Sequence, residues 1–200
     1  MTGGLGAGKS TALDALAALG AAVLSTDVVV HELYETPEVR DAVVARFGPR
    51  VAPHDRVDRA ALAELAFASD EGRAWLEQLL WPRVGERVAA WRDEVSARRP
   101  SPVAAVVETP LLFEAGLEGM YDATIAVVAD ERLREARARA RGHRALAQRA
   151  ARQLSQDEKA TRATYTVVND GTVEELQTRL AELLPQLSPQ GAPRRHDLRS

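Results

Sequence analysis

The chain contains 200 residues, of which 46% are hydrophobic, and it carries a formal net charge of −3. This size and apolar content suit one α/β domain with a sizeable core, and the small negative charge gives no general cationic surface for nucleic acid. The sequence has no cysteine, which excludes disulfides and thiolate catalysis, and no apolar run nears the roughly 20 residues of a membrane helix. We therefore expect a cytoplasmic protein that binds neither nucleic acid nor membrane.

Helix and strand signals alternate along the first half of the chain. An apolar stripe from residue 9 to Gly20 predicts a helix, and Ala21–Ser25 predicts a short buried strand. Helical segments follow at about 28–47, 58–67 and 71–97. Asp58 is the expected N-cap of the second segment, and the third is either one helix or a pair broken near Pro82.

Apolar runs in the second half predict buried strands at about 102–108, 123–129 and 164–169. An Arg-rich helical stretch separates the last two strands, and a final helix is expected at about 172–184. Strands that alternate with helices are typical of an α/β fold with a parallel sheet. We expect residues 1–184 to form one domain, and residues 185–200, which lack periodicity, to form a disordered tail.

The residues GGLGAGKS, from Gly3 to Ser10, fit the phosphate-loop pattern G-x-x-x-x-G-K-[ST] at the start of a helix. In such a loop the backbone N–H groups hold phosphate oxygens, the lysine reaches the β and γ phosphates, and the serine hydroxyl ligates Mg²⁺. Lys9 is one of two lysines among 26 basic residues, the rest being arginine. We therefore predict a site for ATP and Mg²⁺, formed by Gly3, Gly4, Leu5, Gly6, Ala7, Gly8, Lys9 and Ser10.

A phosphate loop predicts a nucleoside triphosphate but not a reaction. The chain lacks the N-K-x-D string by which a GTP switch reads guanine, and it is short for an ATPase motor. Small-molecule kinases remain, and they need an acceptor site, a base and a mobile cationic lid. Asp27, after the second strand, is the candidate base, and Glu108, at the end of another strand, is a candidate for the Mg²⁺ shell. Each carboxylate could instead cap the helix or turn that follows it.

Seven segments, taken in order, resemble the dephospho-coenzyme A kinase family: TGGLGAGKST, STDVVVHELY, VDRAALAELAF, LLWPRV, TPLLFEAGL, RQLSQDEKATRA and VVNDGT. The resemblance runs from Thr2 to about Leu184. It implies a three-layer P-loop NTPase fold with a parallel sheet, a helical acceptor-binding part at about 28–97 and a lid at about 137–153. It also implies transfer of the γ-phosphoryl group of ATP to the ribose 3′-hydroxyl of dephospho-coenzyme A, the last step of coenzyme A synthesis.

The resemblance assigns roles to individual residues. It implies Asp27 as the catalytic base, with Lys9, Arg137 and Arg141 as the other catalytic side chains. It adds Thr11 to the ATP loop, and it implies that Asn169 and Gly171 lie against the adenine. The acceptor contacts that it implies are Asp27, His31, Pro110, Leu111, Leu112 and Glu114. Ser10 and Glu108 are the expected metal-binding residues.

The sequence departs from the family pattern at several positions. Ser25 replaces the first acid of an Asp-Ala-Asp motif, Trp81 stands where a histidine usually precedes proline, and Val168 replaces an aspartate before Asn169. The lid between residues 142 and 149 is also a few residues short. We expect the three tryptophans to pack in a core, with an acceptor-pocket wall as the alternative; they are Trp75, Trp81 and Trp91.

The Arg-rich stretch has a spacing that suits one anionic target. Arg137, Arg141 and Arg144 recur every three to four residues, so they share a helix face and can clamp a triphosphate. The alternatives are a solvated helix face and an RNA-binding surface. RNA binding is disfavoured because no aromatic residue interrupts the run.

Only Met1 and Thr2 precede the phosphate loop, although a central strand of the sheet normally leads into it. Strand neighbours left without partners would cost about 1–3 kcal/mol for each buried unpaired group. We therefore expect that the first core strand is missing from this sequence and that the true start lies upstream. The alternatives to the kinase named above are a kinase for another small acceptor, or a catalytically weak nucleotide-binding module if the short form is real.

Overall fold

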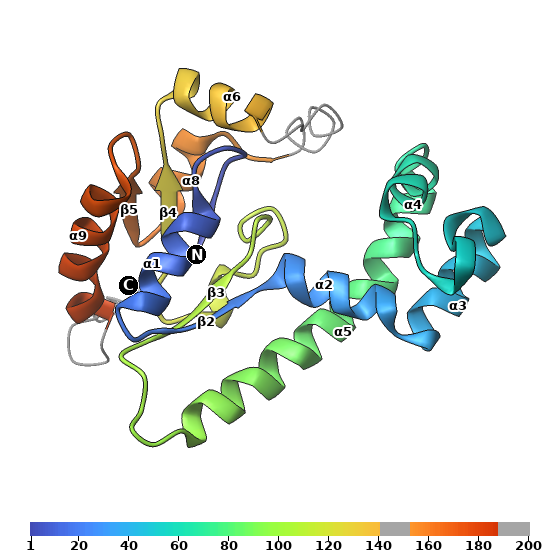
Figure 1. Cartoon of the computed structure of the whole chain (residues 1–200), viewed down its shortest axis with the longest axis horizontal. Helices are drawn as coiled ribbons and strands as arrows, with labels where there is room; N and C mark the ends of the chain where they lie inside the picture. The colour runs from blue at the N-terminus through green and yellow to red at the C-terminus, as the bar shows by residue number, and fades with distance from the viewer. Residues whose placement is uncertain (141–152, 188–200) are drawn as a thin grey trace, which may run out of the picture. The chain divides into compact units, whose positions relative to one another are not determined.

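A computed structural model of the chain describes residues 1–140 and 153–187 (Figure 1). The chain divides into two compact units. The first consists of Met1–Leu24 with the described residues from Ala97 onward, and the second is Ser25–Ser96. Most of the expected lid, from 141 to 152, and the expected tail from 188 onward lie outside the described residues.

The strands belong to an α/β fold with a parallel sheet, as predicted. β1 (Thr2–Gly3), β4 (Ile125–Val128) and β5 (Tyr165–Val168) pair in the order β1-β4-β5, and both pairings are parallel. β2 (Ala22–Ser25) pairs with β3 (Ala105–Glu108). β3 and β4 are almost wholly buried, which explains why the sequence shows continuous apolar runs at these strands rather than alternation.

The chain start joins strands on two sides. Thr2 pairs with Ala126 of β4, while the Met1 amino group donates to the Val107 carbonyl at 2.6 Å and the Thr109 N–H donates to the Met1 carbonyl at 2.8 Å. Burial lowers the pKa of the Met1 amino group to about 5, and the Glu108 carboxylate opposes this shift. A short first strand is thus present in the structure, and the expectation of an upstream start stays a prediction.

Within residues 1–140 and 153–187, the α-helices of the first unit are α1 (Lys9–Ala18), α6 (Glu131–Ala140), α8 (Gln156–Arg162) and α9 (Val173–Leu183). α1 and α9 share an apolar core with β4 and β5, to which Leu16, Val127 and Leu180 contribute fully buried side chains. α8 and α9 each begin with a capping box, built on Ser155 and Thr172 respectively. Each cap uses only side chains and N–H groups of its own helix start.

The second unit contains the helices α2 (Thr26–Glu35), α3 (Pro37–Phe47) and α4 (Arg59–Ala66), and most of α5 (Asp70–Ala97). The stretch predicted as helical at about 28–47 is helical, but it consists of two helices that meet at Thr36. Pro37 has no N–H and cannot continue α2, whereas the Thr36 hydroxyl accepts the Val39 N–H and so caps α3. The predicted Asp58 cap is confirmed, since its carboxylate accepts the N–H groups of Ala60 and Ala61 at 2.9 and 3.1 Å.

α5 is one helix that contains Pro82 in its interior. A proline removes one backbone donor and disturbs the hydrogen bonds of the preceding turn. Here the Arg83 guanidinium donates to the Leu79 carbonyl at 2.8 Å and also pairs with Glu38 of α3. In the described part of the chain, no helix has both the length and the apolar content for a membrane span.

Candidate active site

The glycine loop connects β1 to α1 and has the backbone that its sequence predicts. Gly6 and Gly8 have positive φ angles of 74° and 87°, which side chains with a Cβ rarely adopt. A Cβ on Gly3 would lie 2.4 Å from the Val127 carbonyl oxygen of β4. The loop therefore needs glycine both for its turns and for its close contact with the sheet.

The end of the loop presents the start of α1. Gly8 is the N-cap and offers no side-chain oxygen to the first turn, so the N–H groups there are suited to an anion. The Lys9 ammonium donates to the Gly4 carbonyl at 3.2 Å, which lays its side chain along the loop. Ser10 is exposed in the first turn, and Thr11 follows it half-buried.

Asn169 joins the loop to the end of β5. Its side-chain amide is buried and donates to the Ala7 carbonyl at 2.9 Å. The backbone carbonyl of Asn169 accepts from the Arg137 guanidinium at 2.9 Å. Gly171 follows two residues later and faces the Glu175 carboxylate, which accepts the Thr172 N–H. A Cβ at Gly171 would lie 1.5 Å from that carboxylate. The structure thus brings Asn169, Arg137 and the loop together.

Arg134, which the sequence patterns did not single out, also contacts the loop. Its Nε donates to the Leu5 carbonyl at 3.0 Å, across 129 positions of sequence. Arg134 lies one turn before Arg137 on α6, so the same three-to-four spacing could have identified it. Arg141, the next position of that series, lies outside the described residues.

The segment after β3 carries most of the predicted acceptor-side residues. Glu108 and Thr109 are buried at the carboxyl end of the strand, and the Thr109 hydroxyl has no hydrogen-bond partner among the described residues. Leu112 is fully buried, whereas Leu111 is exposed. This segment therefore presents Leu111 outward and anchors itself through Leu112.

Beneath this segment lies a buried ion pair between Lys159 of α8 and Glu114. The Lys159 side chain is wholly buried, and its ammonium lies 2.9 Å from a Glu114 carboxylate oxygen. The same ammonium donates to the Pro110 carbonyl at 2.6 Å and to the Thr2 hydroxyl at 3.4 Å. Three acceptors therefore match its three hydrogens. Burial lowers the pKa of Lys159, and the hydrogen bond and charge of Glu114 oppose this shift.

Glu114 has a second partner at the start of the described segment that leads into α8. Its Oε1 accepts the Leu154 N–H at 2.8 Å as well as the bond from Lys159. The predicted acceptor residue Glu114 thus points into the protein. Lys159 itself had a signal in the sequence, since it is the other lysine of an otherwise Arg-only chain.

Asp27 and His31 both lie on α2, in the second unit. The alternative role of Asp27 as N-cap is wrong, because Ser25 occupies the N-cap and Asp27 lies inside the first turn. Its carboxylate is exposed there, where the helix dipole favours negative charge. His31 is exposed and lies 3.9 Å from Glu35, one turn further along.

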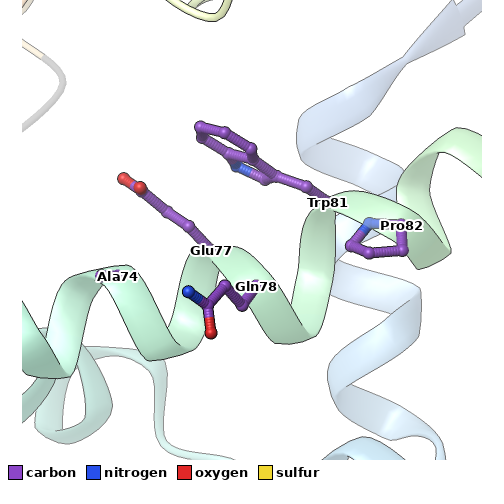
Figure 2. A pocket seen from close by; sticks show the side chains of 5 residues that line it. All are labelled: Ala74, Glu77, Gln78, Trp81 and Pro82. Carbon is purple, nitrogen blue, oxygen red and sulfur yellow. The ribbon is translucent and has the colours of Figure 1, made fainter.

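A surface pocket of about 420 Å³ lies on α5, also within the second unit. Figure 2 shows its lining residues, of which Trp81 and Glu77 project in the same direction from the helix. The full lining is Ala74, Glu77, Gln78, Trp81 and Pro82. Trp81 is 52% exposed, so the expectation that it packs in a core is wrong, whereas Trp75 stacks edge-on against Phe47 at 5.4 Å.

Replacing Lys159 with methionine should destabilise the protein by about 3–5 kcal/mol, because Glu114 would keep its buried charge without a counter-ion. Urea unfolding of the two chains measures this. Arg162→Gln is the matched control on α8, since the pair of Arg162 with Glu118 is partly exposed. Loss of this pair should destabilise the protein much less than loss of the buried pair. The double variant Lys159→Met, Glu114→Leu should recover part of the stability. Equal losses in Lys159→Met and Arg162→Gln would contradict the importance of the buried pair.

The chain matches known proteins over most of its length. The family model for dephospho-CoA kinase matches residues 1–175. The chain is 39% identical to the dephospho-CoA kinase of Moorella thermoacetica, over 96% of this chain and 97% of that protein. It is 40% identical to the dephospho-CoA kinase of Deinococcus radiodurans, over 94% of this chain and 90% of that protein.

Solved structures agree with the fold. The crystal structure of TT1252 from Thermus thermophilus is 32% identical in sequence and superposes with a TM-score of 0.75, covering 94% of this chain and 95% of that one. The dephospho-CoA kinase from Campylobacter jejuni has a TM-score of 0.67 at 21% identity, covering 94% and 96%, and supports the fold alone. The extent of the family match and the identity to curated relatives together mean that this chain belongs to the dephospho-CoA kinase family.

Proposed function

We propose that this protein transfers the γ-phosphoryl group of ATP to the ribose 3′-hydroxyl of dephospho-coenzyme A, giving coenzyme A and ADP in the last step of coenzyme A synthesis. The observation that carries this proposal is the family match over residues 1–175, together with a glycine loop that has the backbone of a phosphate site. A phosphoryl-transfer enzyme works mainly by positioning and by neutralising charge. The residues described above can supply both.

ATP binds through the glycine loop in this proposal. The N–H groups of Gly6 and of Gly8 to Thr11 hold the β and γ phosphates, whereas the Ala7 N–H stays on the Gly4 carbonyl at 3.3 Å. The Lys9 ammonium leaves the Gly4 carbonyl to reach the same phosphate oxygens. Arg137 and Arg141 then offset the charge that develops on the transferred group. The adenine lies against Asn169 and Gly171, beside the loop that Asn169 supports.

A magnesium ion fits the oxygen donors at the head of α1. Ser10 presents an exposed hydroxyl in the first turn, and Glu108 supplies a carboxylate at the carboxyl end of a neighbouring strand. Hydroxyl and carboxylate oxygens are the ligands that Mg²⁺ prefers, directly or through water. When bound, the ion neutralises charge on the phosphate oxygens.

Asp27 acts as the base in this mechanism. Its carboxylate takes the proton of the acceptor 3′-hydroxyl while the hydroxyl oxygen forms a bond to the γ phosphorus, and the bond from that phosphorus to the bridging oxygen of ADP breaks. The exposed position of Asp27 in the first turn of α2 supports the role, because the carboxylate is open to a substrate. His31, one turn further along, and the segment Pro110–Leu112 hold the acceptor.

Glu114 contributes to acceptor binding through its partners. Its carboxylate bonds Lys159, which also bonds the Pro110 carbonyl, so the ion pair supports the segment that holds the acceptor. The pocket at Trp81 is a further acceptor contact in the second unit. An indole at this position supplies a flat apolar surface where the family pattern has a histidine.

Acceptor-dependent ADP release tests the proposed function. ATP and Mg²⁺ are supplied with dephospho-coenzyme A, a nucleoside monophosphate, shikimate or no acceptor. ADP should form rapidly only with dephospho-coenzyme A, and mass spectrometry should show a product heavier by one phosphoryl group. Turnover of another acceptor would indicate a different small-molecule kinase, and ATP binding without turnover of any acceptor would indicate a nucleotide-binding module.

Replacing Asp27 with asparagine should lower kcat by roughly 10²–10⁴-fold, because the amide cannot take the hydroxyl proton. ATP affinity should stay within twofold, since the phosphate loop is unchanged. The control is Glu32→Gln, which neutralises another exposed carboxylate of the same helix and should leave kcat unchanged. Unaltered turnover by the Asp27→Asn enzyme would remove Asp27 from the role of base.

A further inference from the structure

Two glycines of the phosphate loop are not required by its motif. The pattern asks for Gly3 and Gly8 and leaves the four positions between them open, yet Gly4 and Gly6 stand there as well. Arg134 of α6 contacts both. A Cβ on Gly4 would lie 2.9 Å from an Arg134 guanidinium nitrogen, and a Cβ on Gly6 would lie 2.3 Å from the Arg134 carbonyl oxygen. The loop is therefore shaped to receive this one arginine.

The contact between Arg134 and the loop is a charge-assisted hydrogen bond. Arg134 Nε donates to the Leu5 carbonyl at 3.0 Å, which places α6 directly beside the loop near the top of Figure 1. A trans peptide is planar, with its C=O and N–H pointing in opposite directions. Fixing the Leu5 carbonyl toward α6 therefore directs the Gly6 N–H away from α6.

α6 holds a second loop peptide in the same way, through an intermediary. Arg137 bonds the Asn169 carbonyl, and the Asn169 amide bonds the Ala7 carbonyl, each at 2.9 Å. By the same geometry this bond orients the Gly8 N–H. Alternate carbonyls of the loop, those of Leu5 and Ala7, are thus held by side chains, which leaves the N–H groups of Gly6 and Gly8 directed for a ligand.

We infer that Arg134 is a positioning residue for the triphosphate: its bond to Leu5 orients the Gly6 N–H toward the phosphate, and the absence of a Cβ at Gly4 leaves room for its guanidinium. This rests on the proposed binding of ATP at the loop. Arg134 touches the loop from outside and acts through the peptide that it holds. Its charge also lies beside the loop proposed to hold the phosphates, so the test separates position from charge.

Equilibrium binding of ATP with Mg²⁺, measured by calorimetry on the full chain, tests the inference. Arg134→Gln should raise the Kd of ATP by on the order of 10-fold, as expected for a lost hydrogen bond to a charged donor. Arg132→Gln is the matched control, because it removes an exposed positive charge from the same helix and should change Kd less than twofold at 0.1 M salt. The Arg134 effect should persist at 0.5 M salt, where a purely electrostatic effect would be screened.

A double-mutant cycle with Gly4 supplies the readout that a merely structural role would not give. Gly4→Ala alone should weaken ATP binding, because its Cβ displaces the guanidinium. In the Arg134→Gln background the same substitution should cost at least threefold less, since the displaced group is gone. Arg134→Lys, which keeps the charge but not the planar donor, should lie between wild type and Arg134→Gln.

Several outcomes would overturn the inference. They are an unchanged Kd in Arg134→Gln, an effect that disappears at 0.5 M salt, or strictly additive losses for Gly4→Ala and Arg134→Gln. Loss of ATP binding together with a melting temperature lowered by more than about 8 °C would assign Arg134 to folding instead. Because the readout is ATP binding, the result stands apart from the identity of the acceptor, and failure of the proposed kinase activity leaves it measurable.

Discussion

A phosphate-binding loop must keep its N–H groups for the ligand, so its carbonyl groups need partners elsewhere in the fold. In this protein side chains hold three loop carbonyls: Lys9 donates to that of Gly4, Arg134 to that of Leu5 and Asn169 to that of Ala7. The Gly4 carbonyl also accepts the Ala7 N–H at 3.3 Å. The three donors come from α1, α6 and the end of β5. Loop conformation therefore depends on the assembled first unit, although the loop itself is a short continuous segment.

The buried ion pair of Lys159 and Glu114 gives the other end of the site a comparable dependence on assembly. The Lys159 ammonium of α8 bonds Thr2 of β1, and it also bonds Pro110 and Glu114 in the segment after β3. It therefore links α8 to both. Taking such a charge out of water is costly unless all its hydrogens are paired, as they are here. The arrangement thus couples the strand that leads into the phosphate loop to the segment proposed to hold the acceptor.

Much of the fold was predictable because it rests on local patterns. The buried strands, the Asp58 cap and the phosphate loop each follow from a few neighbouring residues. The helical stretch at about 28–47 was predicted, but the boundary that divides it at Thr36 was not, because that boundary depends on one proline. Core packing was also the wrong expectation for Trp81, which is half exposed on α5. An amphipathic helix with several large residues does not by itself show which of them faces a neighbour.

Sequence alone determined the kind of site, since the glycine spacing, the single loop lysine and the helix that follows are adjacent in the chain and act over a few ångströms. It also sufficed to indicate the family, through the order of its motifs. Only the tertiary structure decided which side chains hold the loop and where the second lysine goes. Asn169 and Ala7 are 162 residues apart in the sequence. Many other pairs are equally far apart in the sequence and do not meet in the fold. Hydrogen bonds of this kind, and the desolvation that lowers the pKa of Lys159, exist only after the strands and helices have packed.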